Sequence, residues 1–549
     1  MKSPEGKKSH NVTRRAFIGT TAAGGAALLT GGLASLFKES ANAGTNFPFV
    51  EMTIPQLQAA MTAGQLSAKN LVQGYLNRIQ QLNPTLHAVI ETNSNAIAIA
   101  NSLDQERKAG SVRGPLHGIP ILVKDNIATL DNMQTTAGSL ALYNARVPAD
   151  APLIARLRAA GAIILGKANL GEWANFRDDE AETYPLAVGW SARGGSTNNA
   201  YDLSYTSWGS SSGSAAGAAA NLCAAAVGTE TDGSITGPSA VENIFGLKPT
   251  HGLISGDGIV PISHEQDTAG PMGRSVTDVA ILLGIMQNQQ MDYRPLLQRG
   301  ALNGKVIGRD MRYFDYNYYG SGIPGDEETV AFAENALVVM QSLGATIVDV
   351  DTGDVFAYTG DEFTALLYEF RAQIANYLAT LTHTNLRTLA DLIAFNDAHC
   401  TQEMPYYDQD VFLLADQFPG YPNDPAYVTA RSNATNMARA GIDSVINSGV
   451  DAIVAPHLTN STGPAVAGYP NFSMPVGIRS SGRPAGMLMY STAMREAPLI
   501  AMGYDLEQEL NARQQPKFLG AITPIPNGGF CNKPRQNQGK PHLPHGKIF

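Results

Sequence analysis

The stretch "GSSSGSAAGAAANLCAAAVGTETDGSITGPS", residues 209–239, carries most of the information about fold and chemistry in this chain of 549 residues. A serine- and glycine-rich turn opens a run of small residues, which leads to an acidic loop that holds Glu230 and Asp232 beside Ser234. A serine hydroxyl is a poor nucleophile at neutral pH unless a base lies within hydrogen-bond reach. The meaning of this stretch therefore depends on what the rest of the chain brings to it.

Composition excludes several classes of function. The chain is 44% apolar and 16% charged, with a formal net charge of -10, and without its basic first 43 residues the charge would be about −14. An acidic chain with no basic stripe argues against nucleic acid as a partner. Cys223, Cys400 and Cys531 are scattered and odd in number, so we expect neither a disulfide scaffold nor a zinc site. No phosphate-binding loop and no metal-binding histidine pair is found, so no metal or cofactor is expected.

The first 43 residues have the pattern of an export signal. Arg14 and Arg15 in "TRRAFIG" precede a weakly apolar run, and "ANA" at 41–43 offers a small-residue cleavage site. The pattern resembles a twin-arginine signal. We expect residues 1–43 to direct export to the periplasm or beyond, with no stable membrane association after removal. An uncleaved membrane anchor is the alternative, although the Gly and Thr content makes a poor span.

Helical patterns alternate with short apolar runs along the rest of the chain. "GIPILVKDNI" (118–127) predicts a buried strand ending at Lys124, "APLIARLRAAGAIILGKAN" (151–169) a helix and then a strand, and "GVDAIVAPH" (449–457) another buried strand. The segment 53–82 predicts two amphipathic helices broken at Gly64, with Thr53 as the cap. This alternation predicts an α/β fold with a large mixed, mostly parallel central sheet covered by helices on both faces.

The same patterns suggest one large domain. We expect residues 44–518 to form it, with a mostly helical cap or insertion at 354–447 that lines the substrate cleft. Residues 519–549 have little to bury and are expected to be a flexible tail.

"GSSSG" (209–213) formally matches the GxSxG elbow of α/β-hydrolases. That elbow needs an apolar strand directly before it, but "AYDLSYTSW" (200–208) is polar and aromatic, and the histidine partner would have to be His457. A turn that opens a helix is the favoured interpretation of this match.

Residues 209–239 as a whole resemble the signature region of the amidase signature family. The likeness extends from about residue 51 to 513 through "GQLSAKNLVQGYLNRIQQLNPTLHAVIETN", "AGAIILGKANLGEWANFR", "QDTAGPM" and "VAGYPNFSMPVG", in the family's order. Within the family, "GEWANFR", "GWSARGG" and "GTETDGSI" make the chain most similar to bacterial peptide amidases, which cleave the C-terminal carboxamide of peptides.

The resemblance assigns roles to individual residues. It implies that Ser234 is the nucleophile, that Ser210, held by a cis peptide and 24 positions upstream, relays the proton, and that Lys124 is the base. The expected oxyanion hole is built by the backbone N–H groups of Thr231, Asp232, Gly233 and Ser234. Ser211 and Asp125 are expected to support the triad. The chain departs from the general family pattern at Ser212, Asp232 and Thr236, which puts substrate choice in doubt.

The resemblance implies a serine hydrolase of carboxamide C–N bonds that uses a Ser–cis-Ser–Lys triad and no cofactor. Its partner would be a peptide or small-molecule amide, and the protein a monomer or homodimer. Alternatives are an amidase of small aryl or fatty amides, a protein that works as part of an amidotransferase, and a non-catalytic binding protein on the same fold.

A carboxylate in the oxyanion hole would oppose the developing charge, so the Glu230 and Asp232 side chains are expected to face away and bond to nearby backbone N–H groups. We expect His117, His264 and His457 to be packing residues. Packing is also the favoured role of Trp173, Trp190 and Trp208, with lining of a peptide channel as the alternative.

Overall fold

The computed structural model describes residues 47–178, 187–315 and 327–532. The expected export signal lies outside the described residues, so it stays a prediction. The chain divides into two units, Met1–Val50 and Glu51–Phe549. Everything below concerns the second unit, where no described helix has the length and apolar character needed to cross a membrane.

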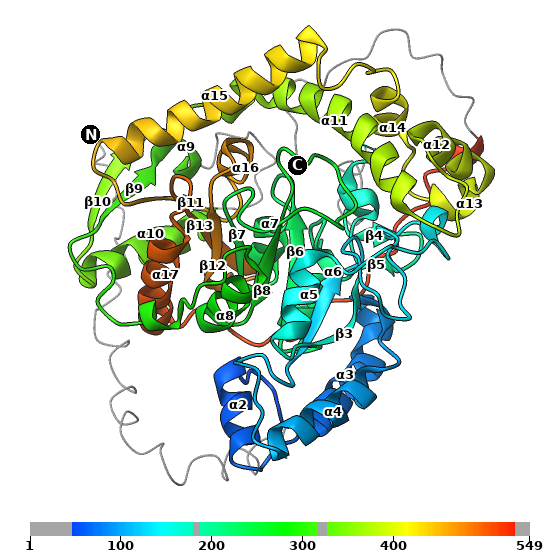
Figure 1. Cartoon of the computed structure of the whole chain (residues 1–549). Coiled ribbons are helices and arrows are strands. Elements are labelled where there is room, and N and C mark those ends of the chain that lie inside the picture. Colours follow the sequence, from blue (N-terminus) through cyan, green and yellow to red (C-terminus); the bar gives the residue numbers. More distant parts are fainter. Residues whose placement is uncertain (1–46, 179–186, 316–326, 533–549) are drawn as a thin grey trace, which may run out of the picture. The chain divides into compact units, whose positions relative to one another are not determined.

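An eleven-stranded sheet runs through this unit (Figure 1). Its strands lie in the order β1 (Val89–Thr92), β3 (Ile163–Ala168), β2 (Pro120–Lys124), β6 (Ala225–Glu230), β8 (Thr268–Gly273), β7 (Phe245–Lys248), β12 (Asn471–Ile478), β13 (Pro484–Tyr490), β11 (Ala452–Pro456), β9 (Val306–Asp310) and β10 (Thr346–Val350). The strands predicted within 118–127, 151–169 and 449–457 are confirmed as β2, β3 and β11, and β2 ends at Lys124 as predicted.

The sheet is mixed, as expected, but it is not mostly parallel. Among the described strands, parallel pairing is confined to two blocks, β3-β2-β6 and β11-β9-β10, and the strands between them pair antiparallel. Parallel neighbours need a long crossover connection, whereas antiparallel neighbours can be joined by a short turn. β12 and β13 are joined by such a turn, which periodicity alone did not reveal.

Helices cover both faces of the sheet, as predicted. Side chains alternate between the two faces along a strand. On β12, Phe472 and Met474 approach Gly503 of α17 (Glu496–Leu510). Gly246, which pairs with Ser473 on the neighbouring strand, approaches Ser239 of α7 (Thr236–Val241) on the other face.

Each layer contains further helices in mutual contact. α17 packs with α8 (Val276–Met286) and α10 (Glu327–Ser342), and α8 packs with α5 (Pro152–Ala159). α7 packs with α6 (Ser212–Ala219), whose serine, glycine and alanine side chains let it lie close to β6 and β2. Two short helices lie beside these layers: α9 (Met311–Phe314) packs on β9, and α16 (Thr462–Ala467) packs on α15.

The two predicted N-terminal helices are confirmed as α2 (Ile54–Thr62) and α3 (Ala68–Leu86), with Gly64 between them. Thr53 caps α2, because its side chain accepts from the Gln56 N–H while the Gln56 side chain accepts from the Thr53 N–H. α4 (Ala96–Lys108) packs on α3 and on β3.

The segment 354–447 is mostly helical, as predicted. It contains α11 (Thr359–Thr380), α12 (Leu389–Ala398), α13 (Cys400–Glu403), α14 (Asp410–Ala415) and α15 (Pro425–Asn447), and we call it the helical region. The long helices α11 and α15 lie side by side, as Figure 1 shows in yellow-green and gold. The inner face of α11 packs Phe363 and Phe370 against Phe176.

One disulfide corrects the expectation drawn from cysteine number. Cys400 of α13 is bonded to Cys531, 131 residues away, and Cys223 is free and buried. The scattered spacing gave no sign of this pair because residues far apart in the chain meet only after folding. The part of the expected tail up to residue 532 is therefore tied to the helical region, and Leu519 also bridges to Asp202.

Candidate active site

Lys124 occupies the inner end of β2, with its side chain fully buried. Its Nζ lies 2.6 Å from Ser210 Oγ, 2.9 Å from Thr229 Oγ1 and 3.1 Å from the Thr229 carbonyl oxygen. Ser210 follows a cis Gly209–Ser210 peptide bond, as the family resemblance implied. The end of one strand and the serine-rich turn thus meet although 86 residues separate them in the chain.

This geometry suits a neutral amine. A neutral amine has two N–H donors and one lone pair, and the carbonyl oxygen of Thr229 can only accept. When neutral Lys124 donates its two N–H groups to Thr229, its lone pair faces the Ser210 hydroxyl and can accept from it. Burial lowers the pKa of Lys124 to about 7, although Asp267 and Glu230 partly offset this by favouring the charged form.

The turn at residues 231–234 is held by bonds to its carbonyl oxygens. The Gln266 side-chain amide donates to the Thr231 oxygen at 3.0 Å, the Gly237 N–H to the Gly233 oxygen at 2.8 Å, and the Ser211 N–H to the Ser234 oxygen at 3.1 Å. Gly233 has a φ of 73°, a left-handed conformation that favours glycine. The N–H groups of Asp232, Gly233 and Ser234 donate to no acceptor among the described residues. They are available to a ligand.

Glu230 behaves as predicted. Its Oε2 accepts from the N–H groups of Ile235 and Thr236 at 2.7 and 2.8 Å and from the Thr236 hydroxyl at 3.1 Å. The carboxylate therefore fixes the start of α7 directly behind Ser234.

The prediction for Asp232 is wrong in one respect. Its side chain is buried, but no backbone N–H of the described residues donates to either carboxyl oxygen. Burial raises the pKa of this carboxyl to about 7, partly offset by the nearby hydroxyls of Thr462 and Ser461. Those hydroxyls lie at the start of α16, a contact that the local sequence could not indicate.

The resemblance implied supporting roles for Ser211 and Asp125. The Ser211 hydroxyl donates to the Thr229 oxygen at 3.0 Å and accepts from the Thr229 N–H at 3.2 Å, which joins the serine-rich turn to β6. Asp125 accepts from the Thr136 hydroxyl at 2.5 Å and from the Gly138 N–H at 3.3 Å. Asp125 thus orders the loop after β2, next to Lys124 in the chain.

The α/β-hydrolase elbow is excluded. No strand directly precedes Ser211 in the described chain, and α6 begins at the next residue. His457 is buried and bonds through its backbone N–H to Gly486. His117 is buried with Nε2 2.9 Å from the Leu103 oxygen, so it packs in the core as expected.

Two of the three tryptophans are packing residues. Trp173 stacks edge-on against Phe412, and Trp190 packs against Tyr406 and Tyr407. Trp208 is only half-buried and lies against Gly237 at the start of α7, so it is the tryptophan beside the nucleophile turn.

Sequence reasoning missed two residues that complete the site. Thr229 accepts from Lys124 Nζ through its hydroxyl and its carbonyl oxygen, and Gln266 reaches the turn from the "QDTAGPM" segment. Both residues lie inside motifs that carry the family resemblance, but their side-chain contacts depend on the pairing of β6 with β2 and β8.

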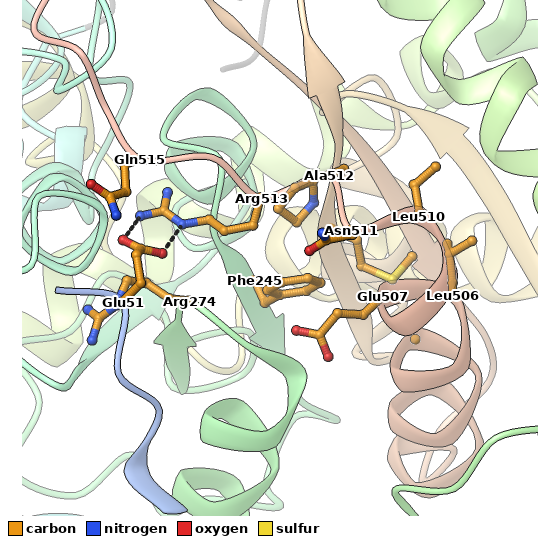
Figure 2. Close-up of a pocket in the computed structure, with 13 residues that line it drawn as sticks. Glu51, Phe245, Arg274, Leu506, Glu507, Leu510, Asn511, Ala512, Arg513 and Gln515 are labelled. Atoms are coloured by element: carbon orange, nitrogen blue, oxygen red, sulfur yellow. Dashed lines mark hydrogen bonds and ion pairs between the residues drawn. The ribbon is translucent and has the colours of Figure 1, made fainter. Parts of the chain in front are cut away.

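A cavity of about 370 Å³, shown in Figure 2, is not this site. It is lined by Phe245, Met474 and Gly503 on the α17 face of the sheet, with a Glu51–Arg513 ion pair at one end. Ser234 leads into α7 on the opposite face.

Comparison with known proteins agrees with this geometry. A family model described as Amidase matches residues 70–465. The chain belongs to the amidase signature family. It is therefore a hydrolase of amide C–N bonds, and its mixed sheet with helical layers is the amidase signature fold.

Three relatives illustrate the range within the family. The solved structure of native peptide amidase from Stenotrophomonas maltophilia is 44% identical, with a TM-score of 0.79, over 86% of this chain and 99% of that one. A protein named probable amidase from Arabidopsis thaliana is 37% identical over 86% of this chain and 93% of its own length. A component of the glutamyl-tRNA(Gln) amidotransferase of Halorhodospira halophila is 30% identical over 85% of this chain and 98% of its own length.

Proposed function

We propose that this amidase is an exported enzyme that hydrolyses the C-terminal carboxamide of peptides through an acyl-enzyme on Ser234. The observation that carries the proposal is the fully buried Lys124 amine, 2.6 Å from the Ser210 hydroxyl. The next residue, Ser211, bonds through its N–H to the Ser234 carbonyl oxygen. The similarity to a peptide amidase, at 44% identity over most of the chain, supports the choice of substrate.

The triad would work as a proton relay. Neutral Lys124 takes the Ser210 proton while Ser210 takes the Ser234 proton, and Ser234 Oγ attacks the amide carbon. The N–H groups of the 231–234 turn receive the negative charge that develops on the carbonyl oxygen. As the C–N bond breaks, the proton returns through Ser210 to the leaving nitrogen, which departs as ammonia.

Water then completes the reaction. It attacks the acyl-enzyme and gives its proton to the same relay, and Ser234 leaves with a proton restored. The net change consumes one peptide amide and one water and yields one peptide acid and one ammonia, with no redox change.

Two observations support export. The first is the "TRRAFIG" signal pattern, which is typical of a route that carries folded proteins. The second is the Cys400–Cys531 disulfide, because disulfides persist mainly in oxidising compartments. Replacing Arg14 and Arg15 together with lysine should keep the protein in the cytoplasm, and unchanged export of that variant would contradict this part of the proposal.

The amidotransferase relative makes a second function worth testing. The assay measures ammonia release from N-acylated dipeptide amides, free glutamine, an aryl amide and a fatty amide. Peptide amides should be hydrolysed fastest, and Ser234→Ala should abolish release, whereas the matched buried variant Ser239→Ala should keep it. Equal release by wild type and Ser234→Ala would contradict the mechanism, and a preference for glutamine or for aryl or fatty amides would contradict the substrate.

A further inference from the structure

Gln266 touches the oxyanion turn from outside it. Its Nε2 donates to the Thr231 carbonyl oxygen at 3.0 Å, and its side chain is 2% exposed. The peptide unit between Thr231 and Asp232 is planar and trans, so its C=O and N–H point in opposite directions. A bond that fixes the Thr231 oxygen on one side therefore aims the Asp232 N–H at the other.

The Ser234 N–H, the other main donor of the turn, is oriented by a backbone hydrogen bond to the start of α7. The Gly237 N–H holds the Gly233 oxygen at 2.8 Å, which orients the Ser234 N–H by the same reasoning. The Asp232 N–H has no such internal bond, because the only partner of the Thr231 oxygen among the described residues is the Gln266 amide.

The amide of Gln266 is itself held in one orientation by the helical region. An arginine can only donate, so the Arg431 Nη1 bond at 2.8 Å identifies Oε1 as the acceptor. The amide nitrogen then faces the Thr231 oxygen and Glu362 Oε1 of α11, the latter at 2.6 Å. All hydrogen-bonding positions on the amide nitrogen are filled, so the amide cannot flip without losing bonds.

Arg431 is anchored in turn. Its Nε donates to Glu369 Oε1 of α11 at 2.8 Å, its Nη2 pairs with the other oxygen of Glu369, and the Tyr427 hydroxyl donates to the same carboxylate at 2.9 Å. A continuous set of hydrogen bonds therefore runs from α15 and α11 through Gln266 to the turn.

We propose that Gln266 is a positioning residue for the oxyanion hole, through which α11 and α15 of the helical region orient the Asp232 N–H toward the reacting carbonyl oxygen. The proposal rests on the proposed function, since it assumes that the 231–234 turn stabilises an oxyanion formed by attack of Ser234. It gives the helical region a part in the chemistry in addition to its expected place along the substrate cleft.

The test compares Gln266→Met and Gln266→Glu with Gln373→Met. Both Gln266 variants keep the side chain's size, and Gln266→Met has no donor for the Thr231 oxygen, whereas Gln266→Glu has none when its carboxyl is ionised. Gln373 is a matched control, because it is equally buried, lies on α11 and bonds to the same loop at the His264 N–H and Glu265, but does not reach the turn. Kinetics on a peptide amide and affinity for a peptide aldehyde, which Ser234 attacks without a leaving group, are the two readouts.

The Gln266 variants should lower kcat by about 10- to 100-fold, somewhat less than deletion of an oxyanion donor, with KM within about twofold. Aldehyde affinity should fall by a similar factor, and Gln373→Met should leave both quantities near wild type. A kcat within about twofold of wild type in either folded Gln266 variant, or an equal loss in Gln373→Met, would overturn the proposal. If Ser234→Ala remains active, the proposed function has failed instead, so the two failures are distinguishable.

Discussion

Two buried lysines at the ends of neighbouring strands have different surroundings. Lys124 ends β2 and Lys167 lies near the end of β3, with Val123 paired to Lys167 and Lys124 paired to Ala168. Because side chains alternate along a strand, the two amines leave the sheet on opposite faces. Lys124 meets the Ser210 hydroxyl, whereas Lys167 donates to the Ile127 oxygen and, at 2.9 Å, to the Thr135 hydroxyl.

Both amines are buried and both have carboxylates nearby that favour the charged form. Burial lowers the pKa of both amines, to about 7 for Lys124 and about 8 for Lys167, and Asp125 and Asp131 help Lys167 keep its proton. Lys167 fits the role of an internal cation that ties the 125–136 loop to the sheet. Burial alone therefore does not make a lysine a base, because the group that receives or supplies the proton decides its role.

The largest expected effect comes from removing each amine. Lys124→Met should lower kcat/KM for a peptide amide by about 10³-fold or more, because the relay then has no acceptor. Lys167→Met should keep most of the activity of the folded protein but reduce the free energy of unfolding by about 3 kcal/mol, since Asp125 loses a buried partner. Steady-state kinetics and chemical denaturation measure the two effects.

Similar behaviour of Lys124→Met and Lys167→Met would contradict the different roles assigned to the two lysines. An equal loss of kcat/KM in folded Lys167→Met would mean that the reaction depends on both amines. Full activity in Lys124→Met would remove the base from the mechanism.

A smaller effect is expected from the threonine beside each lysine. Thr229→Val removes the hydroxyl that orients Lys124 and should lower kcat/KM by about 10-fold, the value of one hydrogen bond to a charged or polarised group. Thr135→Val is the matched change beside Lys167 and should leave kcat/KM within about twofold. Similar rates for both variants would show that the orientation of Lys124 does not depend on Thr229.

The smallest effect on rate is expected at the disulfide, which contacts neither lysine. Replacing both Cys400 and Cys531 with serine should lower the free energy of unfolding by about 2–4 kcal/mol and leave kcat/KM unchanged at 25 °C. Thermal unfolding with and without reductant measures the loss. A large fall in kcat/KM at unchanged stability would mean that the tail contributes to the site.

The sequence predicted those parts of the structure that depend on local pattern. The strand ending at Lys124, the helices on either side of Gly64 and the helical region each followed from apolar spacing and capping residues. The family resemblance added the positions of Ser210 and Ser234. These features need no knowledge of which distant strands pair.

Features that arise from distant contacts could not be predicted in this way. The antiparallel middle of the sheet depends on strand order, and the Cys400–Cys531 bond joins segments 131 residues apart. The hydroxyl neighbours of Asp232 come from α16, and the amide that holds Thr231 comes from Gln266. Only the folded sheet brings these groups together.

The pH dependence of kcat/KM shows directly whether neutral Lys124 is the base. Since burial lowers the pKa of Lys124 from its ordinary 10.5 to about 7, its neutral form grows as the pH rises through 7. Because the Asp232 carboxyl also has a pKa of about 7, the profile is measured for wild type and for Asp232→Asn. If neutral Lys124 is the base, kcat/KM should rise with a midpoint near pH 7 in both proteins and then level off. A profile that becomes flat in Asp232→Asn, or a midpoint near the ordinary lysine value, would contradict this role of Lys124.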